Sequence, residues 1–153
     1  MKRRLLLLAA LLATGAGAAA LPYDESADAK AALQQALSSA GSDQRQVLMI
    51  FGANWCEDCR ALDLALKSGR NAEQMAREFR VVKVDVGRFN RNLDLSRAYG
   101  DPVGKGIPAA VVLSPDNRVL YATRAGELAN ARRMSESGIY DFFHDVVQQA
   151  RSH

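Results

Sequence analysis

The sequence predicts an α/β fold in which a mixed central sheet lies between two layers of helices. Two short apolar runs without polar alternation, at 46–52 and 80–86, are typical of buried central strands. Helical periodicity between them favours parallel pairing of these two strands. A third apolar run at 109–114 is joined by a tight turn to a strand at 118–123, which adds an antiparallel hairpin. We therefore expect a three-layer α/β/α sandwich.

Helices are expected before, between and after these strands, where apolar residues recur every three or four positions. The first is expected to stop at Gly41, and the third to begin with Asn71 as its N-cap. The expected helices are 24–40, 56–69, 71–79, 90–100 and 135–150.

The first twenty residues have the layout of a secretory signal peptide. Positive residues 2–4 precede a Leu/Ala run, and small residues follow with an A-x-A cleavage site at 18–20. A membrane anchor is the alternative, but it needs about 20 strongly apolar residues, and this run weakens into Gly and Thr. We expect residues 1–20 to be removed, leaving one domain with an N-terminal helical segment at 21–45 and a core at 46–150.

Removal of this leader changes the meaning of the net charge. The chain of 153 residues carries +3, from 20 Lys plus Arg and 17 Asp plus Glu, and three of the cations lie in the leader. The mature chain is therefore neutral, and it has no Lys/Arg-rich block with interleaved aromatic residues, so no nucleic-acid partner is predicted. We expect an exported, periplasmic protein that is soluble once the leader is removed.

The only two cysteines, Cys56 and Cys59, stand in the stretch NWCEDCRAL. A disulfide that closes so short a loop adds little stability, so the pair favours chemistry over a structural role. Cys56 follows a strand and opens a helix, where backbone N–H groups stabilise a thiolate. Cys59 lies one turn further on and is placed to attack a mixed disulfide at Cys56. Trp55 provides a flat apolar wall beside this nucleophile.

Metal and haem chemistry fit these residues less well. A zinc site needs three or four ligands, and beyond carboxylates the chain offers only His144, expected to be an exposed helix residue, and His153 at the terminus. Covalent haem attachment requires a histidine where Arg60 stands. We expect no metal and no organic cofactor, and a redox centre made of the Cys56–Cys59 disulfide.

Three stretches together resemble the thioredoxin superfamily over roughly residues 46–150. They are VLMIFGANWCEDCRAL, VVKVDV, and GIPAAVVLSPDNRVLYATRAG, which contain a Trp-Cys-x-x-Cys motif and an Ile-Pro pair before the next-to-last strand. The chain is similar to exported thioredoxin-like proteins, among them the C-terminal domain of the membrane carrier that supplies reductant to the bacterial periplasm.

The resemblance implies that Cys56 attacks the substrate and Cys59 resolves the mixed disulfide. It also implies that the Ile107–Pro108 bond is cis, with the backbone of Ile107 presented to an extended substrate. X–Pro is the bond type in which cis is least costly, although an ordinary trans proline also suits the start of a strand. Gly126 falls where the family has a glycine in a neighbouring substrate-facing loop.

Two departures from the family pattern bear on proton transfer and helix shape. Ile50 stands where members often hold a buried Asp that helps to deprotonate the resolving cysteine. Lys83 matches a lysine that accompanies that Asp, and we expect it to be a solvated strand-end residue. Water or a nearby carboxylate then takes the proton of Cys59. Leu64 replaces the proline that kinks the helix, so a straighter helix is expected.

Glu57 and Asp58, between the cysteines, bear on the direction of electron flow. Their negative charge opposes a thiolate at Cys56, and an oxidising pair needs a stabilised thiolate. We therefore predict a comparatively reducing pair, with Arg60 offsetting part of this effect. The alternative is that both acids only solubilise the start of the helix.

These observations predict an exported thiol–disulfide oxidoreductase that reduces protein disulfides and receives electrons from a membrane donor. An alternative is a thioredoxin-like metallochaperone or assembly factor that holds a soft metal such as Cu(I) on the two cysteines. A disulfide isomerase is a third possibility, although it generally needs a second substrate-gripping surface.

Overall fold

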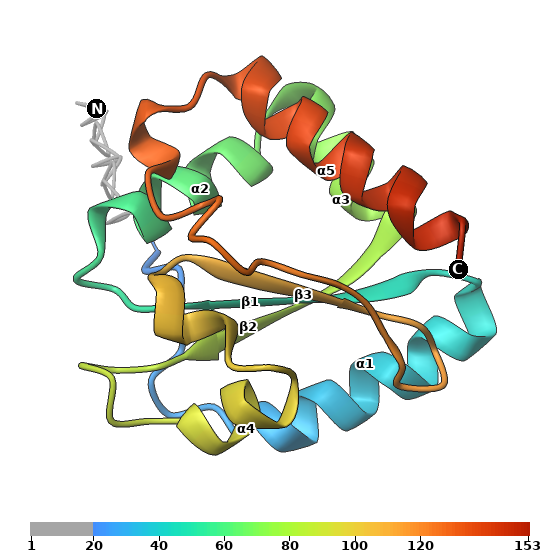
Figure 1. Ribbon diagram of the computed structural model, residues 1–153, viewed down its shortest axis with the longest axis horizontal. Coiled ribbons are helices and arrows are strands. Elements are labelled where there is room, and N and C mark those ends of the chain that lie inside the picture. The colour runs from blue at the N-terminus through green and yellow to red at the C-terminus, as the bar shows by residue number, and fades with distance from the viewer. Residues whose placement is uncertain (1–19) are drawn as a thin grey trace, which may run out of the picture.

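The computed structural model describes residues 20–153 and places a four-stranded mixed sheet between two layers of helices (Figure 1). The strands are β1 (Gln46–Gly52), β2 (Phe79–Asp85), β3 (Ala109–Leu113) and β4 (Val119–Ala122), in the spatial order β2-β1-β3-β4. The helices are α1 (Ala29–Asp43), α2 (Glu57–Leu66), α3 (Gly69–Glu78), α4 (Leu93–Ala98) and α5 (Glu136–Arg151), with short 3₁₀ turns η1 (Pro102–Lys105) and η2 (Ala131–Arg133).

The strand pairing confirms the predicted mixed sheet. β1 lies parallel to β2 and antiparallel to β3, and β3 and β4 form the antiparallel hairpin. The predicted leader lies outside the described residues, apart from its last position, 20. Within residues 20–153, no helix is long and apolar enough to cross a membrane.

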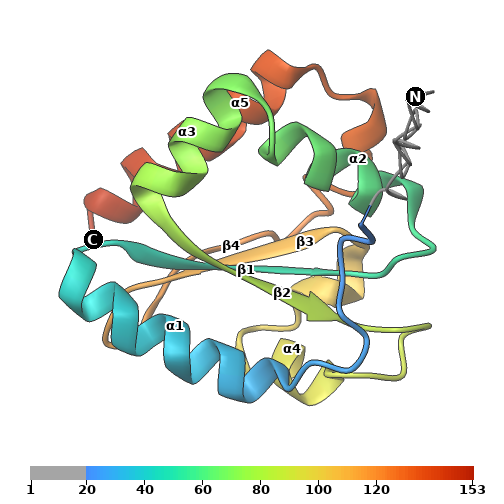
Figure 2. The same ribbon diagram turned by 180° about the vertical axis from the view of Figure 1, so that it is seen from behind.

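The central strand β1 explains why its sequence is apolar throughout. Val47, Met49 and Phe51 pack on one face of the sheet with residues of α1 and α4. Leu48 and Ile50 point to the other face, where the core also contains residues of α2, α3 and α5. Figures 1 and 2 show these two helix layers on opposite sides of the sheet. A strand covered on both faces has no solvated side and therefore no polar alternation.

The first helix differs from its prediction at both ends. It begins at Ala29 because the Asp28 carboxylate caps it, accepting a 3.0 Å hydrogen bond from the Ala31 N–H. The prediction that it stops at Gly41 is wrong. The helix runs through this exposed glycine to Asp43, and the chain turns at Gln44, whose φ is 58°.

The prediction that Asn71 caps a helix is also wrong. Helix α3 begins at Gly69, with Ser68 at the N-cap, and Asn71 is buried inside the first turn. Its side-chain amide donates a 3.1 Å hydrogen bond to the Glu136 carbonyl at the start of α5. The polar residue that was expected to cap a helix therefore joins two helices.

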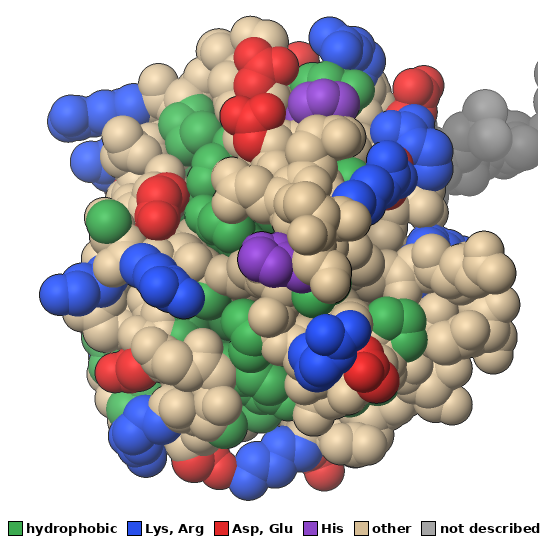
Figure 3. All heavy atoms as spheres, turned by 45° about the vertical axis from the view of Figure 1, so that its right-hand side comes forward, with side chains coloured by type: hydrophobic (Ala, Val, Ile, Leu, Met, Phe, Trp, Pro, Cys, Tyr) green, Lys and Arg blue, Asp and Glu red, His purple; other side chains and the backbone are tan. Residues whose placement is uncertain are grey.

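Charges of both signs are interspersed around hydrophobic patches on the face drawn in Figure 3, where both histidines are visible. His144 is exposed on α5, as expected, and stacks on Tyr140 with ring centroids 6.1 Å apart.

Candidate active site

The two cysteines form a disulfide in the segment where β1 is followed by α2. Cys56 is the N-cap of the helix, and its sulfur accepts a 3.2 Å hydrogen bond from the Cys59 N–H. Both are buried, but Cys56 is 6% exposed and Cys59 only 1%. Backbone N–H groups at a helix start favour negative charge, so this position stabilises a thiolate at Cys56.

An exposed aromatic shelf, formed by Trp55 and Phe89, lies beside the disulfide. Trp55 is 45% exposed, and its indole N–H donates a 2.8 Å hydrogen bond to the Gly87 carbonyl. Phe89, also 45% exposed, packs edge-on against the indole with centroids 5.9 Å apart. Trp55 therefore forms the apolar wall that the sequence predicts. Phe89 was not anticipated, because it lies in a loop without periodicity.

A second wall comes from the segment before β3. The Ile107–Pro108 bond is cis, as the resemblance implied, and the Ile107 carbonyl oxygen lies 3.8 Å from the Cys56 sulfur. Gly126 has a φ of +71°, and a Cβ at this position would lie 2.7 Å from the Lys105 carbonyl oxygen. Gly126 therefore lets its loop pack closely against the chain leading to Ile107.

The acids between the cysteines both contact Arg132. The Arg132 N–H donates a 2.9 Å hydrogen bond to Asp58, and its guanidinium pairs with Glu57. Arg60, expected to offset part of their charge, donates a 2.7 Å hydrogen bond to the Asn54 carbonyl. The offsetting cation thus comes from η2, which lies far along the chain.

An ion pair between α2 and β2 corrects the expectation for Lys83. Rather than ending a strand in solvent, Lys83 is half-buried within β2, and its ammonium lies 2.6 Å from the buried Asp63 carboxylate. Lys67 binds the other oxygen of Asp63 at 2.7 Å. Burial raises the pKa of Asp63, but the hydrogen bonds and charges of Lys67 and Lys83 outweigh it and hold that pKa below its ordinary value. Burial lowers the pKa of Lys83, although Asp63 opposes this effect.

Asp63 supplies the buried carboxylate that β1 lacks. Ile50 is fully buried and pairs in register with Lys83, so no acid faces the lysine from the strand. Asp63 instead approaches from α2, four residues after Cys59 and on the same helix face. A single acid between two leucines, four positions from the second cysteine, is the signal that would have found it.

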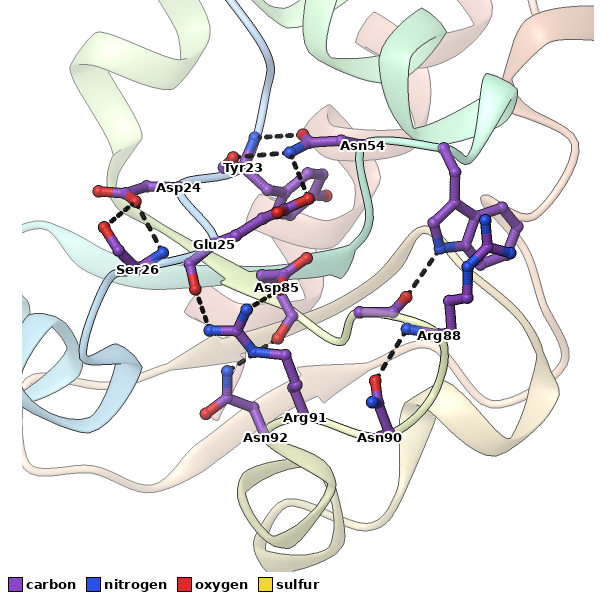
Figure 4. Close-up of polar contacts among 12 residues, drawn as sticks. Tyr23, Asp24, Glu25, Ser26, Asn54, Asp85, Arg88, Asn90, Arg91 and Asn92 are labelled. Atoms are coloured by element: carbon purple, nitrogen blue, oxygen red, sulfur yellow. Dashed lines mark hydrogen bonds and ion pairs between the residues drawn. The ribbon is translucent and has the colours of Figure 1, made fainter.

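The chain before α1 also reaches the site, which the sequence did not predict. Tyr23 exchanges two 2.9 Å hydrogen bonds with the Asn54 side chain, directly before Trp55 (Figure 4). Arg91 donates to the Glu25 carbonyl and lies 3.3 Å from the buried carboxylate of Asp85. Residues 21–26 are thereby fastened to the loop after β1, which leads into the disulfide, and to the loop after β2.

A sequence model described as Thioredoxin-like matches residues 28–115. The chain belongs to this family. A disulphide isomerase from Xylella fastidiosa Temecula1 is similar to it, with 54% identity and a TM-score of 0.82, over 84% of this chain and 98% of that one. A thioredoxin from Thermus thermophilus shares the fold at 20% identity and a TM-score of 0.53, over 75% of this chain and 81% of that one.

Mouse nucleoredoxin is 28% identical in an alignment of 116 positions that covers 61% of this chain, and the chain spans only 26% of the length of that relative. The family, the Xylella relative and the Cys56–Cys59 pair together show a thioredoxin-like thiol–disulfide oxidoreductase.

Replacing Arg132 by Gln removes the cation that offsets the two acids, so the reduced, thiolate-bearing form is destabilised. We expect the reduction potential to become more negative by about 5 to 20 mV, as befits an exposed ion pair. Glu57→Gln is expected to shift it in the opposite direction. Both are measured by equilibration with glutathione buffers.

Arg133→Gln, at the neighbouring exposed arginine, is the matched control and should leave the potential unchanged. A potential that stays fixed or rises in Arg132→Gln would contradict this role.

Proposed function

We propose that the protein is an exported reductase of protein disulfides in which Cys56 attacks the substrate and Cys59 resolves the mixed disulfide. The observation that carries the proposal is the asymmetry of the pair. Cys56 sits at the helix start between the Ile107 carbonyl and the aromatic shelf, whereas Cys59 is sealed beneath it. An incoming protein disulfide meets Cys56 first.

The proposed reaction moves two electrons from the protein dithiol to the substrate. The Cys56 thiolate attacks one substrate sulfur, and the substrate S–S bond breaks to release the first substrate thiolate. The Cys59 thiolate then attacks the Cys56 sulfur. This forms the Cys56–Cys59 disulfide, breaks the mixed disulfide and releases the second substrate thiolate.

Binding of the substrate is assigned to the two walls of the site. An extended substrate chain would lie along the backbone at Ile107 and Pro108, next to the loop of Gly126, and rest an apolar side chain on Trp55. These groups hold the reacting sulfur in line with Cys56, which is how positioning accelerates such an exchange.

Asp63 is the proposed acceptor of the Cys59 proton. It is buried on the same face of α2 as Cys59, and its low pKa keeps it ionised at neutral pH. Because folding lowers the pKa of Asp63, its ion pairs add to the free energy of unfolding at neutral pH. This stabilisation is lost as the pH falls through the lowered pKa and Asp63 becomes protonated. Lys83 and Lys67 keep the carboxylate in place.

Export and the electron donor rest on the sequence. The predicted leader at 1–20 directs the chain to the periplasm, where nicotinamide-dependent reductases are not expected. The oxidised Cys56–Cys59 pair would then be reduced again by a dithiol of a membrane electron carrier, and its partners downstream are disulfide-containing proteins.

Disulfide isomerisation is a second candidate, favoured by the similarity to the Xylella disulphide isomerase at 54% sequence identity. Isomerisation needs only the attacking cysteine, because the substrate itself closes the new disulfide. Net reduction needs both cysteines.

Replacing Cys59 by Ser separates the two candidates. We expect this variant to lose reduction of insulin by dithiothreitol and to accumulate mixed disulfides at Cys56, seen by mass spectrometry. A scrambled ribonuclease assay gives the second readout. If Cys59→Ser recovers ribonuclease activity as fast as the wild type, isomerisation replaces reduction as the function. The two roles would be reversed if the Cys56→Ser variant trapped mixed disulfides at Cys59 while the Cys59→Ser variant trapped none at Cys56.

Replacing Asp63 by Asn removes the proposed proton acceptor. We expect the resolving step to slow by about a hundredfold at neutral pH and to regain speed as hydroxide increases, because solvent must then take the proton. Stopped-flow kinetics with a peptide disulfide follow this step. Asp145→Asn, at an exposed position of α5, is the control. An Asp63→Asn variant that is folded by circular dichroism and resolves at the wild-type rate would exclude Asp63.

A further inference from the structure

The strap formed by residues 21–26 places one buried side chain under the disulfide. Asn54 fixes the Tyr23 backbone from both sides and also donates a 3.2 Å hydrogen bond to Glu25 (Figure 4). With its backbone held in this way, the Tyr23 side chain is driven inward and is only 3% exposed. The Lys83 ammonium lies 4.9 Å from the centre of the Tyr23 ring, which fixes the ring from the side of β2.

The missing side chain of Gly52 creates the space that the tyrosine fills. A Cβ at Gly52 would lie 2.3 Å from the Tyr23 hydroxyl oxygen and 2.8 Å from the Cys59 sulfur. These two atoms therefore approach the same point from different elements, the strap and α2. No residue larger than glycine fits between them, so the last position of β1 brings phenol and sulfur together.

The Tyr23 hydroxyl is a buried hydrogen-bond donor that has no acceptor in the described part of the chain while the two cysteines form a disulfide. Among residues 20–153 no group accepts a hydrogen bond from it. Burial, with the nearby charges of Asp63 and Asp85, raises the pKa of Tyr23 far above its ordinary value, so the phenol keeps its proton. A buried polar group without a partner is costly and points to a partner present in another state.

We propose that the Tyr23 hydroxyl donates a hydrogen bond to the Cys59 sulfur in the reduced protein and stabilises the Cys59 thiolate as it attacks the mixed disulfide. A disulfide sulfur is a weak acceptor, whereas a thiolate is a charged one, so the contact strengthens on reduction. This inference rests on the proposed function, in which Cys59 resolves the mixed disulfide.

The surroundings of Cys59 explain why such a donor is needed. Asp85 is buried close to Tyr23, and its negative charge opposes an anion at Cys59 even after Asp63 has taken the Cys59 proton. A neutral O–H donor offsets that opposition without bringing a further charge into the site. In the resolving step, the Cys59 proton has already left to Asp63, and the electron pair of the thiolate forms the bond to Cys56. Tyr23 keeps its own proton throughout.

Asp85 is the competing acceptor for the same hydroxyl. Both of its carboxylate oxygens are buried without a hydrogen-bond partner in the described part of the chain, and Arg91 reaches only one of them as an ion pair. If the Tyr23 hydroxyl turned to Asp85 on reduction, removal of that hydroxyl would leave the chemistry of Cys59 unchanged. The experiment below therefore reads Cys59 directly.

Tyr23→Phe removes the hydroxyl and keeps the ring. The probe is one equivalent of dithiobis(nitrobenzoate), which releases one coloured thiolate when Cys56 attacks and a second when Cys59 resolves. In stopped flow, we expect the second release to slow by about tenfold or more, because a hydrogen bond to a charged group is lost, and the first to keep the wild-type rate. Tyr99→Phe, whose hydroxyl donates to Asn117 at 2.8 Å, is the matched control and should change neither phase.

A titration of the Cys59 thiolate gives a second test, because its midpoint would not change if Tyr23 had only a structural role. In a Cys56→Ser background, absorbance of the Cys59 thiolate is followed against pH, and Tyr23→Phe is expected to raise its midpoint by about one unit or more. Should Tyr23→Phe fail to fold, the carbon next to the hydroxyl of Tyr23 is followed by NMR in the otherwise wild-type reduced protein, where its shift should change as Cys59 ionises.

The inference would be overturned if a folded Tyr23→Phe protein kept the wild-type rate of the second release and the wild-type Cys59 titration. It would also be overturned if the NMR shift of Tyr23 did not change when Cys59 ionises. The proposed function is tested separately by turnover of the wild type on insulin. If the wild type fails to reduce insulin, the reductase function is rejected. If the wild type reduces insulin but Tyr23→Phe keeps the wild-type second release and Cys59 titration, only the role of Tyr23 is rejected.

Discussion

The junction between β1 and α2 is the constraint on which the rest of the structure depends. β1 ends in Gly52, and the chain must turn so that Cys56 caps the helix while Cys59 points back into the protein. One sulfur therefore lies at a helix start beside the surface, and the other lies above a buried polar layer. The aromatic shelf, the Ile107 wall and the strap all gather around this junction. These groups can act on one sulfur and not on the other because Cys56 lies near the surface and Cys59 is buried.

The electrostatics of the two sulfurs are correspondingly different. Around Cys56, the helix start favours a thiolate and the acids of the motif oppose it, with Arg132 taking up part of their charge. Around Cys59, the buried carboxylate of Asp85 opposes a thiolate, as does that of Asp63 until it accepts the Cys59 proton. Arg91 lies 3.3 Å from Asp85 and Lys83 lies 2.6 Å from Asp63, so each cation offsets part of the negative charge. We propose that the sum of these effects favours the disulfide over the dithiol, so that the reduced pair gives up its electrons readily.

Most of the fold could be predicted from local patterns, because a strand buried on both faces and an amphipathic helix each leave a periodic trace in the sequence. The order of elements, the parallel β1–β2 pair and the β3–β4 hairpin follow from such traces. The same patterns were misleading at Gly41 and Asn71, where the packing of the helix outweighs the usual preference of the residue for a helix end.

From residue spacing alone, the site was predictable only where its residues share one motif, whereas Ile107, Pro108 and Gly126 were implied by the family resemblance. Cys56, Cys59 and Trp55 are neighbours in sequence, so spacing alone places them together. Arg132 and Tyr23 come from distant segments that reach the motif through tertiary folding, and a single exposed arginine or a tyrosine near the start carries no periodic signature. Lys83 was expected in solvent because its acidic partner was sought at Ile50 in β1, whereas α2 provides it.

The reduction potential of the Cys56–Cys59 pair tests the central claim of this account most directly, since it measures the balance of charges around both sulfurs. Equilibration of the full mature chain with glutathione buffers, followed by thiol counting, gives the value. We predict a reducing pair with a potential of about −270 mV. A value at the oxidising end, about −120 mV, would contradict it and would identify a protein that takes electrons from its substrates instead of supplying them.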